Sequence, residues 1–118
     1  MKVLIVEDNQ DARDFLSFFL SREGHEVIEA EDGEEGLNKA RKEKPPLILT
    51  DISMPRMNGV DMIHTLRREP DLSDVKIIAL TAHGNDTIHA AKNAGADAVV
   101  RKPAPPDSIT ELIRQMSS

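Results

Sequence analysis

Four apolar runs of the sequence are each followed, within two residues, by side chains that can take part in metal or phosphoryl chemistry. These side chains are Glu7, Asp8, Asp51, Thr81 and Lys102. If the apolar runs are parallel strands of one sheet, their carboxyl ends meet at one edge. Three carboxylates, one hydroxyl and one ammonium group would then lie close together. The spacing therefore predicts a charged site at that edge.

The three carboxylates need a positive partner. Two unit charges about 4 Å apart repel by about 4 kcal/mol at an effective dielectric constant of about 20. Lys102 could offset this repulsion, and so could a divalent cation. A ligand set made of oxygen atoms, without His or Cys, suits Mg²⁺ or Mn²⁺. We therefore expect the acids to bind Mg²⁺, with Mn²⁺ as the alternative ion.

Beside a divalent cation, an aspartate carboxylate can attack phosphorus and form an aspartyl phosphate. Phosphoryl transfer depends mainly on positioning and charge neutralisation. Asp51 is the predicted acceptor, and the metal, Lys102 and Thr81 would each contact one phosphoryl oxygen. In the loop that follows Asp51, the Ser53 backbone carbonyl could serve as a further metal ligand.

Other residues near these positions have structural interpretations. Asp8 and Asn9 could cap a helix instead of forming a site. The occurrence of Asp51 and Lys102 at matching strand ends favours the site. Pro55 is expected to stiffen the loop after Asp51, and Gly59 to allow an unusual backbone conformation there.

The strands that would position these residues are short apolar runs, at 3–6, 25–30, 47–49, 75–80 and 98–100. Four of them are nearly continuous, which is typical of strands buried on both faces of a parallel sheet. The run at 25–30 alternates with acids, as at a half-exposed edge. Helical periodicity between the runs predicts five helices. The sequence thus predicts an α/β fold, a doubly wound (βα)5 parallel sheet with helices on both faces.

The first predicted helix has an apolar stripe that we expect to face the core, made of Ala12, Phe15, Leu16, Phe19 and Leu20. Gly24 and Gly95 are expected to end the first and fourth helices. Pro105 and Pro106 are expected to introduce the fifth.

Composition argues against several classes of protein. The net charge of −6 opposes non-specific nucleic-acid binding, and the three aromatic residues lie in one segment. There is no cysteine, and no apolar run approaches the length of a membrane span. The loop after the first run carries acids instead of the glycines that cradle a dinucleotide. We expect one cytoplasmic domain, residues 1–118, that contacts neither nucleic acid nor membrane directly.

The chain resembles the receiver domain of bacterial two-component response regulators, over nearly its whole length. The motifs that carry the resemblance are VLIVEDN at 3–9, DISMPRMNG at 51–59, IALTA at 78–82, GAD at 95–97 and KP at 102–103. The resemblance implies a flavodoxin-like sheet with strand order 2-1-3-4-5, as in single-domain chemotaxis regulators. It also implies that Asp51 accepts a phosphoryl group from a phosphohistidine on a sensor histidine kinase or a histidine phosphotransfer protein.

The resemblance further implies a set of metal ligands. Asp8 would bind Mg²⁺ directly and Glu7 through water, while Asp51 and the Ser53 carbonyl would complete the protein ligands. A protein of this kind is a phosphoacceptor that assists its own phosphorylation and dephosphorylation; it is not an enzyme in the usual sense.

For the switch, the resemblance implies that Thr81 supplies the responding hydroxyl and Lys102 the lysine. The Lys102–Pro103 peptide bond would be cis. The face made by the fourth helix, the fifth strand and the fifth helix would bind an output partner, which the sequence does not name.

Two positions depart from the family pattern. Receivers commonly carry Tyr or Phe three residues before the lysine, where this chain has Val99, so the usual hydroxyl-to-aromatic relay cannot operate in full. The residue after Lys-Pro is often Phe, and here it is Ala104.

Two alternative functions stay open. Val99 keeps open a pseudo-receiver that docks partners without being phosphorylated. A phosphatase acting through an aspartyl phosphate is less favoured, because Ser53 stands where such enzymes carry a second acid.

Overall fold

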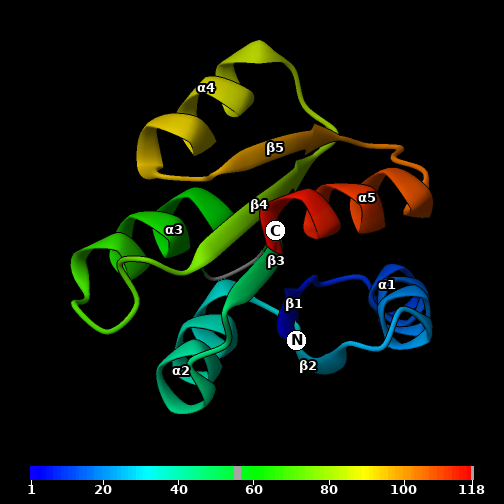
Figure 1. Ribbon diagram of the computed structural model, residues 1–118. Helices are drawn as coiled ribbons and strands as arrows, with labels where there is room; N and C mark the ends of the chain where they lie inside the picture. The colour runs from blue at the N-terminus through cyan, green and yellow to red at the C-terminus, as the bar shows by residue number, and fades with distance from the viewer. Residues whose placement is uncertain (55–56, 118) are drawn as a thin grey trace.

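The computed structural model describes residues 1–54 and 57–117, in which five strands and five helices alternate along the chain (Figure 1). The strands are β1 (Lys2–Val6), β2 (Glu26–Ala30), β3 (Leu47–Asp51), β4 (Lys76–Thr81) and β5 (Ala98–Arg101). The helices are α1 (Gln10–Arg22), α2 (Gly33–Glu43), α3 (Gly59–Arg68), α4 (Asn85–Ala94) and α5 (Pro106–Ser117). All the strand pairs are parallel, and the order is β2-β1-β3-β4-β5. The predicted fold class and strand order are confirmed.

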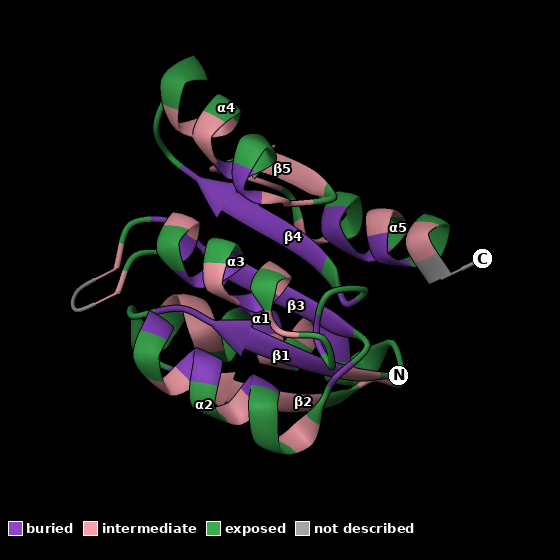
Figure 2. Ribbon diagram, turned by 90° about the vertical axis from the view of Figure 1, so that its left-hand side faces the viewer, coloured by how far each residue is buried: buried purple, intermediate pink, exposed green. Residues whose placement is uncertain are grey.

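Helices cover both faces of the sheet, so the protein has two apolar cores. In one core, the face of the sheet with Leu4, Ile48 and Ile77 packs against α2, α3 and α4. In the other, the face with Ile5 and Leu49 packs against α1 and α5. Because β1, β3 and β4 are buried on both faces, their sequences are almost wholly apolar (Figure 2).

The strands at the two edges of the sheet are less buried than the central three. β2 is the edge strand whose alternation with acids indicated partial exposure, and only its last residue, Ala30, is buried. β5 forms the opposite edge and is half-buried along most of its length. Within residues 1–54 and 57–117, no helix combines the length and the apolar character that crossing a membrane requires.

The expectation that Phe15 faces the core is wrong. Leu16 and Leu20 are buried and carry the packing of α1, whereas Phe15 is 51% exposed and Phe18 is 59% exposed. The Phe15 ring instead lies against the ring of Phe19, with 4.7 Å between the ring centroids.

Helix ends follow the expected chemistry in most places. Asn9 caps α1 by accepting a hydrogen bond from the Ala12 N–H at 2.9 Å, which leaves Asp8 outside the cap. Asp32 caps α2 in the same way. α1 ends before Gly24, α4 ends before Gly95, and α5 begins at Pro106.

Gly59 was expected to allow an unusual backbone conformation, and this expectation is wrong. Gly59 does not have a positive φ. Its N–H donates to the Ile52 carbonyl at 2.8 Å, and a side chain at this position would collide with the Asp51 carbonyl oxygen. Glycine is needed here because the loop after β3 returns very close to the strand end. Pro55, the other predicted loop residue, lies outside the described residues.

Candidate functional site

The site lies where four parallel strands end at the same edge of the sheet. The register of β3 and β4 sets Asp51, the last residue of β3, beside Leu80. Thr81 ends β4 and pairs with Arg101 of β5. The Lys102 N–H donates to the Thr81 carbonyl at 2.7 Å, which continues the ladder one residue beyond the strand. The Lys102–Pro103 peptide bond is cis, as the resemblance implied.

Three carboxyl groups come together at this edge. Glu7, Asp8 and Asp51 each place a carboxylate oxygen within 4.8 Å of the others. Glu7 is 2% exposed and Asp51 is 7% exposed, whereas Asp8 lies at the surface. The acids that the sequence assigned to separate strand ends therefore form one cluster, with a solvent-facing side at Asp8.

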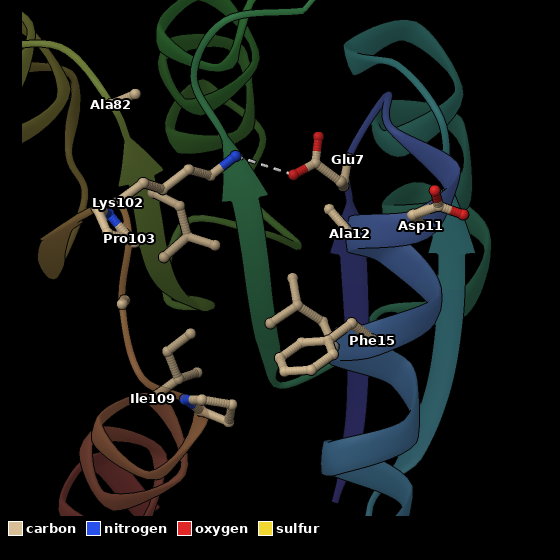
Figure 3. A pocket seen from close by; sticks show the side chains of 12 residues that line it. Glu7, Asp11, Ala12, Phe15, Ala82, Lys102, Pro103 and Ile109 are labelled. Atoms are coloured by element: carbon tan, nitrogen blue, oxygen red, sulfur yellow. Dashed lines mark hydrogen bonds and ion pairs between the residues drawn. The ribbon is translucent and has the colours of Figure 1, made fainter.

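Lys102 reaches across the strand ends into this cluster. Its Nζ lies 3.0 Å from Glu7 Oε1 and 3.3 Å from Asp51 Oδ2 (the Glu7 contact is dashed in Figure 3). Burial alone would lower the pKa of Lys102, but the hydrogen bond that its ammonium group donates to Glu7 and the attraction of both carboxylates raise that pKa. Lys102 is thus a fixed positive charge at neutral pH.

Backbone groups fix the orientation of both buried carboxylates. The Ile52 N–H donates to Asp51 Oδ1 at 2.9 Å, and the Asn9 N–H donates to Glu7 Oε2 at 3.2 Å. Arg13 supports the end of β1 by donating to the Glu7 backbone carbonyl at 2.8 Å. Nothing in the sequence singles out Arg13, because a contact with a backbone carbonyl does not depend on the residue type of the partner.

The cluster carries more negative than positive charge. Desolvation at the crowded edge, followed by the neighbouring Glu7 carboxylate, raises the pKa of Asp8. One lysine faces three acids, so a further cation would lower the energy of the ionised cluster. The atoms that could bind a metal ion are all carboxylate oxygens. Those of Asp8 lie at the surface, where a cation can enter with some of its water ligands. This set fits Mg²⁺, which prefers carboxylates and retains water ligands.

Thr81 and Ser53 lie at the margins of the cluster. Thr81 is 1% exposed, and its Oγ1 accepts a hydrogen bond from the His83 N–H at 2.9 Å. A hydroxyl that accepts in this way still has its own hydrogen to donate. Ser53 is exposed and, with His83, borders a surface cavity of about 530 Å³ between the loop after β3 and α4.

Comparisons with known proteins agree on one family. A family model described as the response regulator receiver domain matches residues 3–114. An uncharacterized 14.6 kDa protein of Leptolyngbya boryana is 34% identical over 98% of this chain and 88% of its own length. The probable transcriptional regulator ycf27 of Pyropia yezoensis is 41% identical over 98% of this chain, but the match spans only 46% of that protein.

Solved structures give the same likeness. Chemotaxis protein CheY4 of Vibrio cholerae has a TM-score of 0.91 and is 30% identical, over 97% of this chain and 96% of that one. A CheY-like receiver domain protein of Methanospirillum hungatei has a TM-score of 0.91 and is 32% identical, over 98% and 91% of the two chains.

Proposed function

Because the chain belongs to the response regulator receiver family, whose members are signalling switches, we propose that it is switched by phosphorylation of Asp51. The phosphodonor is a phosphohistidine on a sensor histidine kinase or a histidine phosphotransfer protein. One observation carries the proposal: a buried carboxylate at the end of β3 contacts Lys102 and lies within 4.8 Å of two further acids. Residues 1–118 are proposed to form one receiver domain that works in the cytoplasm.

The geometry around Asp51 suits an attack on phosphorus. Its Oδ1 is held by the Ile52 N–H, while Oδ2 faces Lys102. As an Asp51 oxygen bonds to phosphorus, the bond from phosphorus to the donor histidine breaks, and its electron pair returns to the imidazole. Lys102 offsets the charge that collects on the phosphoryl oxygens, and the Thr81 hydroxyl can donate to one of them.

Mg²⁺ is the proposed cofactor, with Mn²⁺ able to replace it. Asp8, Asp51 and the Ser53 carbonyl would hold the ion directly, and Glu7 through water. When bound, the ion supplies the positive charge that the cluster lacks and neutralises the incoming phosphoryl group. Glu7 has the additional task of holding Lys102, through the 3.0 Å contact.

Phosphorylation would change the partners of Lys102 and Thr81, and so shift the equilibrium between two arrangements of α4. The proposed output surface is the face made by α4, β5 and α5. Val99 is half-buried and packs against the core on the side of α2, α3 and α4. It has no ring to turn inward, so we propose that α4 responds through Thr81 and the loop after it.

Labelling with a small phosphodonor tests the function. Incubation with acetyl phosphate and Mg²⁺ should add one phosphoryl group, detected by intact-protein mass spectrometry. Asp51→Asn or excess chelator should abolish it, whereas Asp74→Asn, an exposed acid on the loop before β4, should not. Labelling of Asp51→Asn at the wild-type rate would disprove the assignment.

The competing function is that of a pseudo-receiver, a module that docks its partners without being phosphorylated. Val99, which replaces the usual aromatic residue, favours this alternative. Beryllofluoride, which mimics a phosphoryl group on aspartate, separates the two by nuclear magnetic resonance. A switch should show shifts at the site and along α4, β5 and α5. Shifts confined to the strand ends would favour a module that docks its partners without a phosphorylation signal.

A further inference from the structure

Asn58 and Gly59 are the only asparagine–glycine pair in the sequence. The other asparagines precede residues that have side chains; they are Asn9, Asn38, Asn85 and Asn93. An asparagine before glycine is chemically labile, because glycine has no Cβ to shield its backbone nitrogen. The pair lies where the segment after β3 enters α3, and Asn58 is exposed to water. Asn58 is therefore a candidate for spontaneous chemical modification.

The modification is a deamidation whose only reactant besides the chain is water. A base in the solvent takes the proton of the Gly59 N–H, and the nitrogen forms a bond to Asn58 Cγ. The bond from Cγ to the side-chain nitrogen breaks, and that nitrogen leaves as ammonia with a proton from water. Water then opens the cyclic succinimide at either of its carbonyl groups. Opening at one gives aspartate; opening at the other gives isoaspartate, in which the backbone runs through the side chain and is longer by a methylene group.

The folded structure protects both reacting groups. The Gly59 N–H donates to the Ile52 carbonyl at 2.8 Å, and Gly59 is buried, so a base in the solvent does not reach this proton. The Asn58 side chain caps α3, and its Oδ1 accepts a hydrogen bond from the Asp61 N–H at 2.9 Å. Both hydrogen bonds must break before the ring can close. An exposed side chain is thus held in an unreactive arrangement.

The packing of Gly59 adds to this protection. A Cβ at this position would lie 2.4 Å from the Asp51 carbonyl oxygen and 2.9 Å from Ile52 Cα, so the glycine lies directly against the end of β3. Freeing its nitrogen requires the start of α3 to move away from the strand that carries the phosphoacceptor. The rate of deamidation therefore measures how often this contact opens.

The two products affect the fold differently. Aspartate caps a helix as well as asparagine does, and its charge is favourable at a helix N-terminus. Isoaspartate lengthens the backbone between the cap and Gly59, so the cap and the hydrogen bond to Ile52 cannot both form. Ile52 and Ser53 directly follow Asp51, and the Ser53 carbonyl is a proposed metal ligand. Isoaspartate at 58 therefore disturbs the proposed site from outside the acidic cluster.

We propose that Asn58 is a deamidation site that the folded protein protects, and that its conversion to isoaspartate abolishes phosphorylation of Asp51. The first half of this inference needs no phosphoryl chemistry, whereas the second half rests on the proposed function of Asp51. The aspartate product keeps the switch. The loss of function comes from the lengthened backbone, not from the added charge.

The first experiment measures the rate of deamidation at each asparagine, by peptide mapping with mass spectrometry at mildly alkaline pH. In urea above the unfolding midpoint, Asn58 should react roughly tenfold faster than the control Asn38, which precedes Lys39. In folded protein the rate at Asn58 should be lower by roughly tenfold or more, although its side chain is exposed. Equal rates at Asn58 in folded and unfolded protein would overturn the protection.

The second experiment tests what isoaspartate does. Protein aged in urea is refolded, its isoaspartate content is measured with a protein isoaspartyl methyltransferase, and it is then labelled with acetyl phosphate and Mg²⁺. The fraction that fails to be labelled should equal the fraction that carries isoaspartate. Asn58→Asp, which matches the other product, should be labelled within about twofold of wild type, because the cap is kept. Asn58→Ser, which caps the helix but cannot deamidate, should stay fully labelled after the same ageing.

The outcomes separate the inference from the function beneath it. Full labelling of the isoaspartate fraction would overturn the effect on Asp51. Equal loss of labelling in aged Asn58→Ser would assign the damage to another residue and overturn it as well. Failure of fresh wild-type protein to be labelled would overturn the proposed function, and the second half of the inference with it. The deamidation rates of the first experiment would still decide the first half.

Discussion

Lys102 and Arg67 are both partly buried cations that join distant parts of the chain, but the balance of charge around them differs. The Lys102 side chain is 31% exposed and that of Arg67 is 19% exposed. Lys102 contacts two carboxylates with a third nearby, and the negative charges outnumber it. Arg67 contacts one carboxylate and several neutral carbonyls, so its cluster is close to neutral.

Arg67 holds three segments at the C-terminal end of α3. Its Nη1 donates to the carbonyls of Ser73 and Val75, at 2.9 and 2.6 Å, in the loop before β4. Its Nε and Nη2 both donate to the carbonyl of Gly95, which ends α4. Nη2 also lies 3.0 Å from Asp97 Oδ2, which in turn accepts from the Ile77 N–H. The donors of a rigid guanidinium are thus nearly all used.

The close approach of Arg67 also explains why residue 95 is a glycine. Its φ is +122°, and a Cβ placed there would lie 2.7 Å from the Arg67 Cγ. The end of α4 and the arginine therefore fit each other closely. The difference between the two clusters teaches how to tell a structural ion site from a functional one. Around Arg67 the charges are matched within the chain, while in the proposed functional site the carboxylates outnumber the one lysine and leave negative charge for a bound cation to match.

The largest expected effect comes from removing the structural cation. Arg67→Met should lower the free energy of unfolding by about 3 kcal/mol, because Asp97 and three backbone carbonyls lose their donor. Urea denaturation at neutral pH measures this. The control is Arg68→Met at the exposed neighbouring position, which should change stability by less than about 0.5 kcal/mol. Equal effects at the two positions would contradict the structural role of Arg67.

Removing the cation of the functional site should cost less and should respond to metal. Lys102→Met leaves Glu7 and Asp51 without their shared partner, and we expect a loss of about 2 kcal/mol in chelator. Added Mg²⁺ should recover part of this loss, since it binds the same acids. It should recover nothing for Arg67→Met. Identical Mg²⁺ responses in the two variants would remove the distinction between the clusters.

Metal binding to the wild-type protein is expected to be a smaller, saturable effect. At free Mg²⁺ about tenfold above its dissociation constant, the stabilisation should be about 1.4 kcal/mol. Asp8→Asn should lose most of this gain, yet be more stable than wild type in chelator, because one of the three repelling charges is gone. Asp11→Asn, on the first turn of α1, serves as the control and should keep the Mg²⁺ response.

The smallest expected effect is that of the Arg41–Glu69 pair at the surface. Arg41 donates to both oxygens of Glu69 at 2.8 to 3.1 Å, and this hydrogen bond lowers the pKa of Glu69. An acid whose pKa is lower in the folded than in the unfolded protein stabilises the fold at pH values above its unfolded-state pKa. This stabilisation is lost as the pH falls through the folded-state pKa. The difference in urea midpoint between wild type and Arg41→Gln should therefore be constant above pH 5 and disappear as the pH falls below the ordinary glutamate pKa of 4.5. A difference that persists at lower pH would show that it comes from packing.

The sequence predicts the clustering of the acids around Lys102 far better than the cluster around Arg67. Asp51 and Lys102 follow apolar runs, and parallel strands bring their carboxyl ends to one edge whatever the details of packing. A basic residue such as Arg67 near a helix C-terminus is explained sufficiently by the helix dipole, so its position in the sequence points to no cluster. Its true partners are mostly backbone carbonyls, which every residue possesses, so no residue type in the sequence marks them.

Phe15 shows a second limit of sequence reasoning. Its spacing from Ala12 and Phe19 is that of a residue on the buried face of a helix. The structure instead leaves its ring 51% exposed, beside a surface hollow that Ala104 also lines. Helical periodicity predicts which residues share a face. It does not predict how wide a neighbouring element is, and that width decides whether the margin of the stripe is buried.

The position of β1 in the sheet has a consequence for the growing chain. Val3 pairs with Val27 on one side and with Leu47 on the other. At translation rates of about 5–20 residues per second, roughly 2–9 s separate the synthesis of Val3 from that of Leu47. For that time β1 has at least one edge without a partner strand, a state that favours mispairing with other chains. Slower translation between the first and third strands would lengthen this exposure, so the yield of native protein should depend on codon usage in that interval.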